Sequence, residues 1–217
     1  MMLGTILGPV TANELDKKVM EVVHKYDVSP ALKHMGLVSE GQLREVQDTN
    51  DKSNLYYQWL ACLIRLLKPQ QVVELGAAAG ISTIMMATEL PKDSKLYSVD
   101  NDPEIAWKWM DREYPQVVKI LGDTRDDKIW PVDCFEPFSI AEGLTNTDIW
   151  FFDSLHTQEQ LEAELALYSP NFKKGAVLVF DDIHINPGMG KVWNELPYNK
   201  QDISTPCHWS GFGVAVV

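Results

Sequence analysis

Apolar and polar positions change their period repeatedly along the chain, and this change predicts strands that alternate with helices. Short apolar runs, which are typical of buried strands, occur at 72–75, 95–99, 117–121, 149–152 and 176–180. Apolar positions with helical spacing predict helices at 53–67, 81–89, 103–113, 158–168 and 190–196. Strands that alternate with helices predict a parallel sheet with helices on both of its faces.

The two ends of the chain and one central segment depart from this alternation. Residues 1–52 mix charges, glycines and Pro30, and they predict short helices around 14–25 and 40–46 that cap the substrate side. Residues 123–146 predict a long loop, and 202–207 and 212–217 predict two strands joined by a tight turn. We therefore expect a single domain. Its core at 53–217 would be a Rossmann-like three-layer α/β sandwich with a mostly parallel seven-stranded sheet, an antiparallel C-terminal hairpin and added N-terminal helices.

Acidic residues end four of the predicted strands. They are Glu74, Asp100, Asp153 and the pair Asp181 and Asp182. Ligands bind beyond the carboxyl ends of parallel strands, and a carboxylate that is buried without a partner costs free energy. A single acid at such a position can equally well cap the next helix. Acids at four strand ends together favour a polar binding site.

The segment after the first strand predicts a nucleoside site. Gly76 and Gly80 follow Glu74 with small residues between them, which lets backbone N–H groups and a helix N-terminus approach a ligand closely. Asp100, at the end of the next strand, could accept hydrogen bonds from ribose hydroxyls. A dinucleotide site needs G-x-G-x-x-G, whereas Ala78 occupies the second glycine position. A cofactor without phosphates fits this turn better, and an NAD-linked oxidoreductase remains the alternative.

Charge and cysteine usage narrow the classes of partner. The 217 residues carry a formal net charge of −12, and the longest basic run is the pair Lys173 and Lys174. Such a chain repels polyanions, so we expect no nucleic-acid partner. Cys62, Cys134 and Cys207 lie far apart and form no CxxC motif, which favours reduced thiols. The apolar N-terminal residues are too few to cross a bilayer. We expect a cytoplasmic protein without membrane association that acts on a small molecule, with a homo-oligomer as an option.

Three segments in order resemble the motifs of class I S-adenosylmethionine-dependent methyltransferases. They are Glu74-Leu-Gly-Ala-Ala-Ala-Gly-Ile-Ser82, Tyr97-Ser-Val-Asp-Asn-Asp-Pro103 and Leu121-Gly-Asp-Thr124. The resemblance covers about 53–217. It implies that S-adenosylmethionine is the cofactor, with Glu74 and Asp153 in its site and Asp100 at the ribose. It places the methionine end at Gly76, Ala77, Ala78, Gly80 and Ser82, and the adenine between Asp123 and Thr124.

The later strand ends resemble those of metal-dependent small-molecule O-methyltransferases of the catechol, macrolide-sugar and cephalosporin hydroxylase-like groups. Asp153, Asp181 and Asp182 would lie on neighbouring strands, and three carboxylates without cysteine suit a hard cation such as Mg²⁺. His156 follows Asp153 by three residues, and the resemblance implies that it is the general base. The alternative is a histidine that only packs beside the sheet. His184 is either a neighbour of the site or a solvated loop residue.

The expected function is Mg²⁺-dependent O-methylation of a small hydroxylated molecule, such as a sugar, a polyketide or a phenolic. Two alternatives stay open. An NAD-linked oxidoreductase is weakened by the absence of a Tyr-x-x-x-Lys pair from the sequence. A non-catalytic protein that binds S-adenosylmethionine would have no need for three clustered acids.

Overall fold

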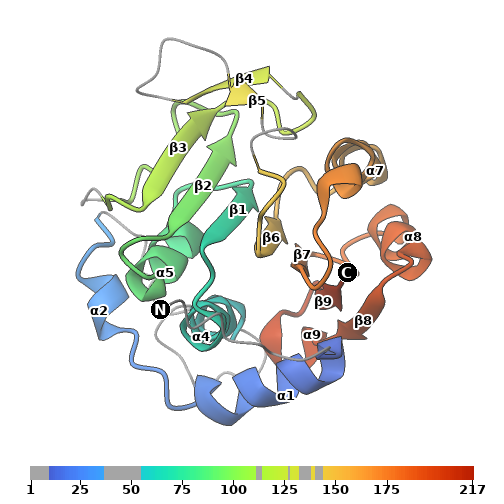
Figure 1. The fold of residues 1–217 in the computed structure, drawn as a ribbon, viewed down its shortest axis with the longest axis horizontal. Helices are drawn as coiled ribbons and strands as arrows, with labels where there is room; N and C mark the ends of the chain where they lie inside the picture. The colour runs from blue at the N-terminus through green and yellow to red at the C-terminus, as the bar shows by residue number, and fades with distance from the viewer. Residues whose placement is uncertain (1–9, 37–54, 111–113, 127, 132–137, 140–143) are drawn as a thin grey trace.

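The computed structural model describes residues 10–36, 55–110, 114–126, 128–131, 138–139 and 144–217. Their strands form one mixed sheet (Figure 1). In spatial order it consists of β5 (Phe138–Ser139), β4 (Lys128–Pro131), β3 (Val117–Leu121), β2 (Lys95–Asp100), β1 (Gln71–Leu75), β6 (Ile149–Phe152), β7 (Val177–Asp181), β9 (Phe212–Val216) and β8 (Asn199–Asp202). The strands from β3 to β7 are parallel, and β9 is antiparallel to both β7 and β8. The predicted mostly parallel sheet with an antiparallel C-terminal hairpin is confirmed.

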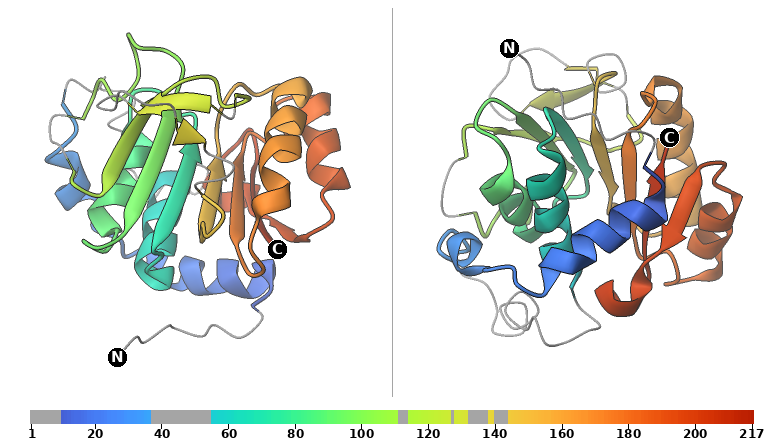
Figure 2. Two further views of the ribbon diagram at one scale, coloured as in Figure 1. Left: turned by 45° about the horizontal axis from the view of Figure 1, so that its top comes forward. Right: turned by 60° about the horizontal axis from the view of Figure 1, so that its bottom comes forward.

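Helices cover both faces of the sheet, so the predicted three-layer sandwich is also confirmed (Figures 1 and 2). The helices are α1 (Ala12–Val23), α2 (Ser29–Leu32), α4 (Tyr56–Leu67) and α5 (Ile81–Glu89) on one face, and α7 (Gln158–Tyr168) and α8 (Pro187–Glu195) on the other. Successive side chains of each strand point to opposite faces of the sheet, so they pack against the two helix layers in turn. Val72 and Phe151 pack with α4 and α5, whereas Val73 and Phe152 pack with α7 and α8.

The parallel register brings the functional strand ends to one edge of the sheet. Leu75 pairs with Val99 on one side and with Phe152 on the other, and Phe152 pairs with Phe180. The residues that follow these positions therefore lie side by side at this edge. They are Gly76, Asp100, Asp153 and Asp181.

The N-terminal helix α1 corresponds to the helix predicted at 14–25. It begins with a capping box between Thr11 and Glu14, and its buried residues share one hydrophobic cluster with α4 and α5. The backbone N–H of Ala12 donates to the side-chain oxygen of Asn199 at 2.7 Å, which ties α1 to β8. The helix predicted at 40–46 lies outside the described residues. The division into a cap at 1–52 and a core at 53–217 stays a prediction.

The helix predicted at 103–113 is wrong over its described part, where residues 103–109 form turns. The backbone N–H groups of Trp107 and Trp109 donate to the carbonyls of Ala78 and Ala79, at 2.8 and 3.0 Å, and not to the preceding helical turn. Trp107 also has φ +55, a left-handed conformation that a helix cannot contain. Contacts with the glycine turn therefore override the local helical pattern.

The loop predicted at 123–146 contains the strands β4 and β5. β4 is antiparallel to β3, with Leu121 opposite Trp130, and β5 pairs with β4. These strands are four and two residues long, too short for an alternating pattern to identify them. Pairing with the edge of β3 accounts for their formation.

The strand predicted at 202–207 is also wrong, because β8 ends at Asp202 and α9 (Ser204–Cys207) follows it. The Asp202 carboxylate accepts the backbone N–H of Ser204 at 3.0 Å and its hydroxyl at 2.5 Å, which starts the helical turn. The Ser204 hydroxyl oxygen in turn accepts the backbone N–H of Phe212 at 3.0 Å. The connection between β8 and β9 is therefore a folded segment and not a tight turn.

Across the described ranges, no helix combines the length and the apolar character needed to cross a bilayer.

Candidate active site

The glycine turn after β1 lies against the strand end that carries the first acid of the predicted metal site. Gly76 has φ +94, and its N–H donates to the carbonyl of Val99 at 2.9 Å. A β-carbon at Gly76 would lie 2.0 Å from the backbone oxygen of Asp153. Only glycine allows this approach, since any side chain would displace the backbone of the neighbouring strand end. The predicted nucleoside turn and Asp153 are therefore in backbone contact.

Glu74 is fully buried at the end of β1, where three hydroxyl groups donate to its carboxylate. The donors are Ser82 at 2.5 Å, Thr83 at 2.6 Å and Ser98 at 2.5 Å. Burial raises the pKa of Glu74, and the hydroxyl donors oppose that shift. The described side chains of Glu74 and Ser82, both expected in the cofactor site, thus bind each other and tie the turn to α5 and β2.

Asp100 lies beside the same turn, as the sequence predicted. One of its carboxylate oxygens accepts the backbone N–H groups of Ala77 at 3.0 Å and Ala78 at 2.7 Å. The other oxygen accepts the N–H of Asp102 at 2.9 Å. Gly80, with φ +93, then begins α5. Four predicted cofactor residues, Ala77, Ala78, Gly80 and Asp100, therefore form one compact unit.

Three side chains on one face of α7 hold Thr124 in place by hydrogen bonds. Its hydroxyl accepts a hydrogen bond from the side-chain amide of Gln160 at 2.7 Å and donates to the carboxylate of Glu164. Its backbone carbonyl accepts the hydroxyl of Tyr168 at 2.6 Å. The three α7 residues are spaced by four, so they share one helix face. Burial raises the pKa of Glu164, which is fully enclosed.

Asp123 precedes Thr124 and remains partly exposed. The guanidinium of Arg125 binds its carboxylate, with Nε at 3.0 Å, and this contact lowers the pKa of Asp123. The segment predicted to flank an adenine thus has one partly exposed acid with a lowered pKa and one buried threonine that hydrogen bonds hold in place.

The ends of β6 and β7 bring the three predicted metal-binding acids together. Asp181 and Asp182 are both buried, and Asp182 has the left-handed φ of +57. Burial and the facing carboxylate of Asp181 raise the pKa of Asp153 well above its usual range. Carboxylates that face one another in this way repel, and a proton or a cation relieves the repulsion.

His156 reaches the same group of acids. Its Nε2 lies 3.3 Å from Oδ2 of Asp182 and 3.8 Å from Oδ1 of Asp153. The Asn186 side chain donates to the carbonyl of His156 at 2.8 Å and also caps α8, so the backbone that carries the histidine is fixed. The imidazole is 32% exposed and is therefore open to a ligand. The structure brings the predicted base and the predicted acids together.

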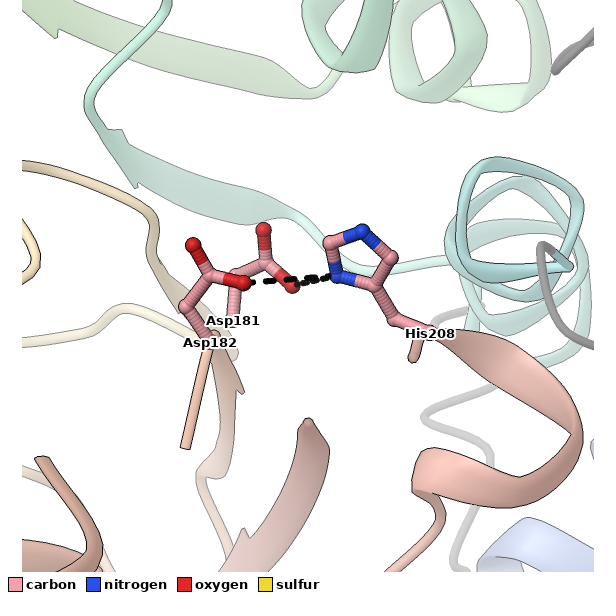
Figure 3. A group of neighbouring side chains, drawn as sticks. All are labelled: Asp181, Asp182 and His208. Carbon is pink, nitrogen blue, oxygen red and sulfur yellow. Dashed lines mark hydrogen bonds and ion pairs between the residues drawn. The ribbon is translucent and has the colours of Figure 1, made fainter. Parts of the chain in front are cut away.

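His208 is a site residue that the sequence analysis missed. Its Nδ1 lies 2.9 Å from Oδ1 of Asp181 and 3.6 Å from Oδ1 of Asp182 (Figure 3). The Ser210 hydroxyl donates to Asp182, and the ring of Tyr56 stacks on the imidazole with 4.5 Å between centroids. The position of His208 follows from the antiparallel pairing of β9 with β7. Residues just before β9 must lie beside the end of β7, where Phe212 pairs with Asp181.

The donor set at this point fits a divalent cation. Asp181, Asp182 and His208 each offer one ligand atom, and these atoms lie within 4.8 Å of one another. Two carboxylates and one imidazole are common ligands of divalent metals. Asp153 faces Asp181 but is not one of these three residues, so its role as a ligand stays a prediction. His184 lies elsewhere, with its Nε2 2.7 Å from Asp202, and both side chains are nearly half exposed.

Comparisons with known proteins bear on this site. A family described as a methyltransferase domain matches residues 73–183, just over half of the chain. A catechol O-methyltransferase from Niastella koreensis is 40% identical over 58 residues, which cover 25% of this chain and 26% of that protein. The match thus spans about a quarter of the length of this curated relative.

Two solved structures have a similar fold. A methyltransferase from Geobacter sulfurreducens superposes with a TM-score of 0.58 at 16% identity, over 93% of this chain and 97% of that one. The O-methyltransferase TomG from Streptomyces achromogenes, in complex with SAM, gives 0.55 at 19% identity, over 100% and 99%. At such identities the likeness concerns the fold alone. The family match supports the methyltransferase interpretation over the NAD-linked one, and it confirms the resemblance that the motifs indicated. The chain belongs to the methyltransferase domain family.

Proposed function

We propose that this protein transfers a methyl group from S-adenosylmethionine to a hydroxyl oxygen of a small molecule, with the help of a divalent cation such as Mg²⁺. One observation carries the proposal. The close approach of Gly76 to the backbone of Asp153 joins the nucleoside turn to the cluster of acids and histidines at one sheet edge. Family membership supports the same reaction class.

The cofactor half of the site would consist of the glycine turn, Asp100 and the segment after β3. S-adenosylmethionine supplies a methyl group that its sulfonium activates. The turn contributes small residues and positive φ angles that let backbone approach the ligand. Asp100 would accept the ribose hydroxyls, and Asp123 and Thr124 would flank the adenine. The hydroxyls bound to Glu74 and the hydrogen bonds from α7 to Thr124 keep these elements in place before the ligand arrives.

The acceptor half would consist of His156 and the acids at the ends of β6 and β7. His156 would take the proton from the acceptor hydroxyl, and Asp182, at 3.3 Å, would stabilise the resulting imidazolium. Asp153, Asp181 and Asp182 would hold a divalent cation, whose positive charge would lower the pKa of a nearby hydroxyl. The buried aspartates are held in position by their own contacts, so they need little reorganisation.

The proposed partner is therefore a small hydroxylated acceptor, such as a sugar, a polyketide or a phenolic. The net charge of −12 supports the exclusion of nucleic acid. Two free cysteines in the described ranges, Cys62 and Cys207, are both buried, in keeping with a reducing, cytoplasmic setting.

A histidine substitution tests the proposed base. His156→Ala should lower the rate of methyl transfer about 100-fold and leave the affinity for S-adenosylmethionine unchanged, because the side chain acts on the acceptor proton. The assay follows radiolabelled methyl transfer to a panel of catechols and sugars in the presence of Mg²⁺. His24→Ala, an exposed histidine beyond α1, is the matched control.

The outcomes separate the possible functions. Normal turnover by His156→Ala would show that the base is assigned wrongly. Binding of S-adenosylmethionine without transfer to any acceptor would favour the non-catalytic binding protein. Absence of both binding and transfer in the wild type would overturn the proposed function.

A further inference from the structure

His208 enters the acidic cluster from an element that lies outside the three predicted metal-binding residues. It follows α9 and precedes β9, and its backbone N–H donates to the carbonyl of Ser204 at 2.8 Å. Tyr56 of α4 stacks on its imidazole. Two packed elements thus hold the ring where its Nδ1 points toward Asp181 and Asp182 (Figure 3).

The distances within this group match those of atoms that share one ion. Two ligand atoms that are each about 2.1 Å from a metal lie at most about 4.2 Å apart. The His208 nitrogen lies 2.9 Å from the nearer Asp181 oxygen and 3.6 Å from that of Asp182. Both distances fall below the limit, and all three ligand atoms lie within 4.8 Å of one another, so a common cation requires the carboxylates to adjust their positions.

An imidazole ligand changes which divalent metals the site binds most tightly. Mg²⁺ prefers oxygen ligands and keeps several waters, whereas first-row transition metals such as Fe²⁺, Co²⁺ and Zn²⁺ bind imidazole well. We infer that His208 is a ligand of the cation and that the site selects a divalent first-row transition metal over Mg²⁺. This inference rests on the proposed cation-binding role of Asp181 and Asp182, and it revises the metal that the sequence alone predicted.

The competing account makes His208 a charged partner of the acids. A protonated imidazole between Asp181 and Asp182 would relieve their repulsion without any metal. The two accounts differ in what happens when the imidazole is removed. Loss of a ligand weakens the binding of a transition metal, whereas loss of a competing cation strengthens the binding of any divalent ion.

Calorimetric titration of the 217-residue chain with Co²⁺ and, separately, with Mg²⁺ distinguishes the accounts. The wild type should bind Co²⁺ at least tenfold more tightly than Mg²⁺. His208→Ala should lower the Co²⁺ affinity by more than tenfold and change the Mg²⁺ affinity by less than threefold. His184→Ala is the matched control, because that imidazole also contacts an aspartate but lies outside the cluster. It should change neither affinity.

A second readout gives a decisive result on the wild type alone, without the variant. The visible absorption of Co²⁺ responds to its ligands, and pulsed electron paramagnetic resonance of bound Mn²⁺ reports a directly coordinated nitrogen. We expect nitrogen coupling in the wild type and its loss in His208→Ala. Absence of nitrogen coupling in the wild type, or equal binding of Co²⁺ and Mg²⁺, would overturn the inference, as would tighter binding of both ions by His208→Ala. If S-adenosylmethionine still binds and Mg²⁺ supports methyl transfer, only this inference fails and the proposed function stands.

Discussion

Two groups of carboxylates lie at the same edge of the sheet, in very different surroundings. At the ends of β1 and β2, Glu74 and Asp100 accept hydrogen bonds from hydroxyl and backbone N–H groups of the chain itself. At the ends of β6 and β7, Asp153, Asp181 and Asp182 face one another and two histidines. The first group lies beside the glycine turn, and the second lies where an acceptor and a cation would bind.

This contrast separates acids that stabilise the fold from acids that are arranged to bind a ligand. A buried carboxylate with neutral donors on its oxygens has its hydrogen-bonding needs met within the fold. A buried carboxylate that faces other carboxylates is left with repulsion that only a proton or a cation removes. Substitution of Glu74 in the first group should therefore change stability, whereas substitutions in the second group should change ligand binding.

Gly76→Ala should cause the largest loss of stability, because it disrupts the backbone contact between the glycine turn and Asp153. The new β-carbon would meet the backbone of Asp153 at 2.0 Å, so we expect a loss of about 4 kcal/mol in the free energy of unfolding, or failure to fold. Gly175→Ala is the matched control. Gly175 also has a positive φ, yet a β-carbon there would meet nothing within 4 Å, so about 1 kcal/mol should be lost. Equal losses in urea unfolding would show that the backbone angle alone requires glycine.

The second-largest effect compares one acid from each group by its contribution to the free energy of unfolding. Glu74→Leu leaves three buried hydroxyls without their acceptor, and we expect it to cost about 3 kcal/mol in the free energy of unfolding. Asp181→Asn, measured in the same way, should cost less than about 0.5 kcal/mol or should stabilise the protein, because it removes repulsion. If Asp181→Asn destabilises as much as Glu74→Leu, the distinction between the two groups is wrong.

The smallest effect is a pH dependence at Glu164. Burial raises its pKa in the folded state, so its contribution to stability is full below the pKa of the unfolded chain and is lost as the pH rises through the folded value. Glu164→Gln removes this dependence. As the pH rises from 5 to 8, the free energy of unfolding of the wild type in urea should fall relative to that of this variant. Glu162→Gln, an exposed acid on the same helix, should show no such change. A parallel pH dependence in wild type and Glu164→Gln would refute the assignment.

The sequence predicted those parts of the fold that depend on local pattern. The bounds of α5, β6 and α7 agree with the prediction residue for residue, because a continuous apolar run or a helical period determines each of them. The helix expected at 103–113 failed because its N–H groups bind the carbonyls of Ala78 and Ala79, which lie about 30 residues earlier in the chain. Hydrogen bonds between residues so far apart in the chain cannot be read from the hydrophobic periodicity of one segment.

The same reasoning explains what was predicted of the site. Asp153, Asp181 and Asp182 could be placed together because the carboxyl ends of neighbouring parallel strands must share one edge. His208 could not be placed, since its segment was expected to be a strand and a tight turn. Its position depends on α9 and on the antiparallel pairing of β9 with β7, and both are tertiary features.

A single calorimetric experiment tests the central claim that one half of the edge binds the nucleoside and the other half binds the cation. S-adenosylmethionine, NAD and Co²⁺ or Mg²⁺ are titrated separately into the wild type and into Asp181→Asn. We expect micromolar binding of S-adenosylmethionine by both proteins, no binding of NAD, and loss of the metal heat in Asp181→Asn alone. Binding of NAD in place of S-adenosylmethionine, or metal binding that survives Asp181→Asn unchanged, would contradict it.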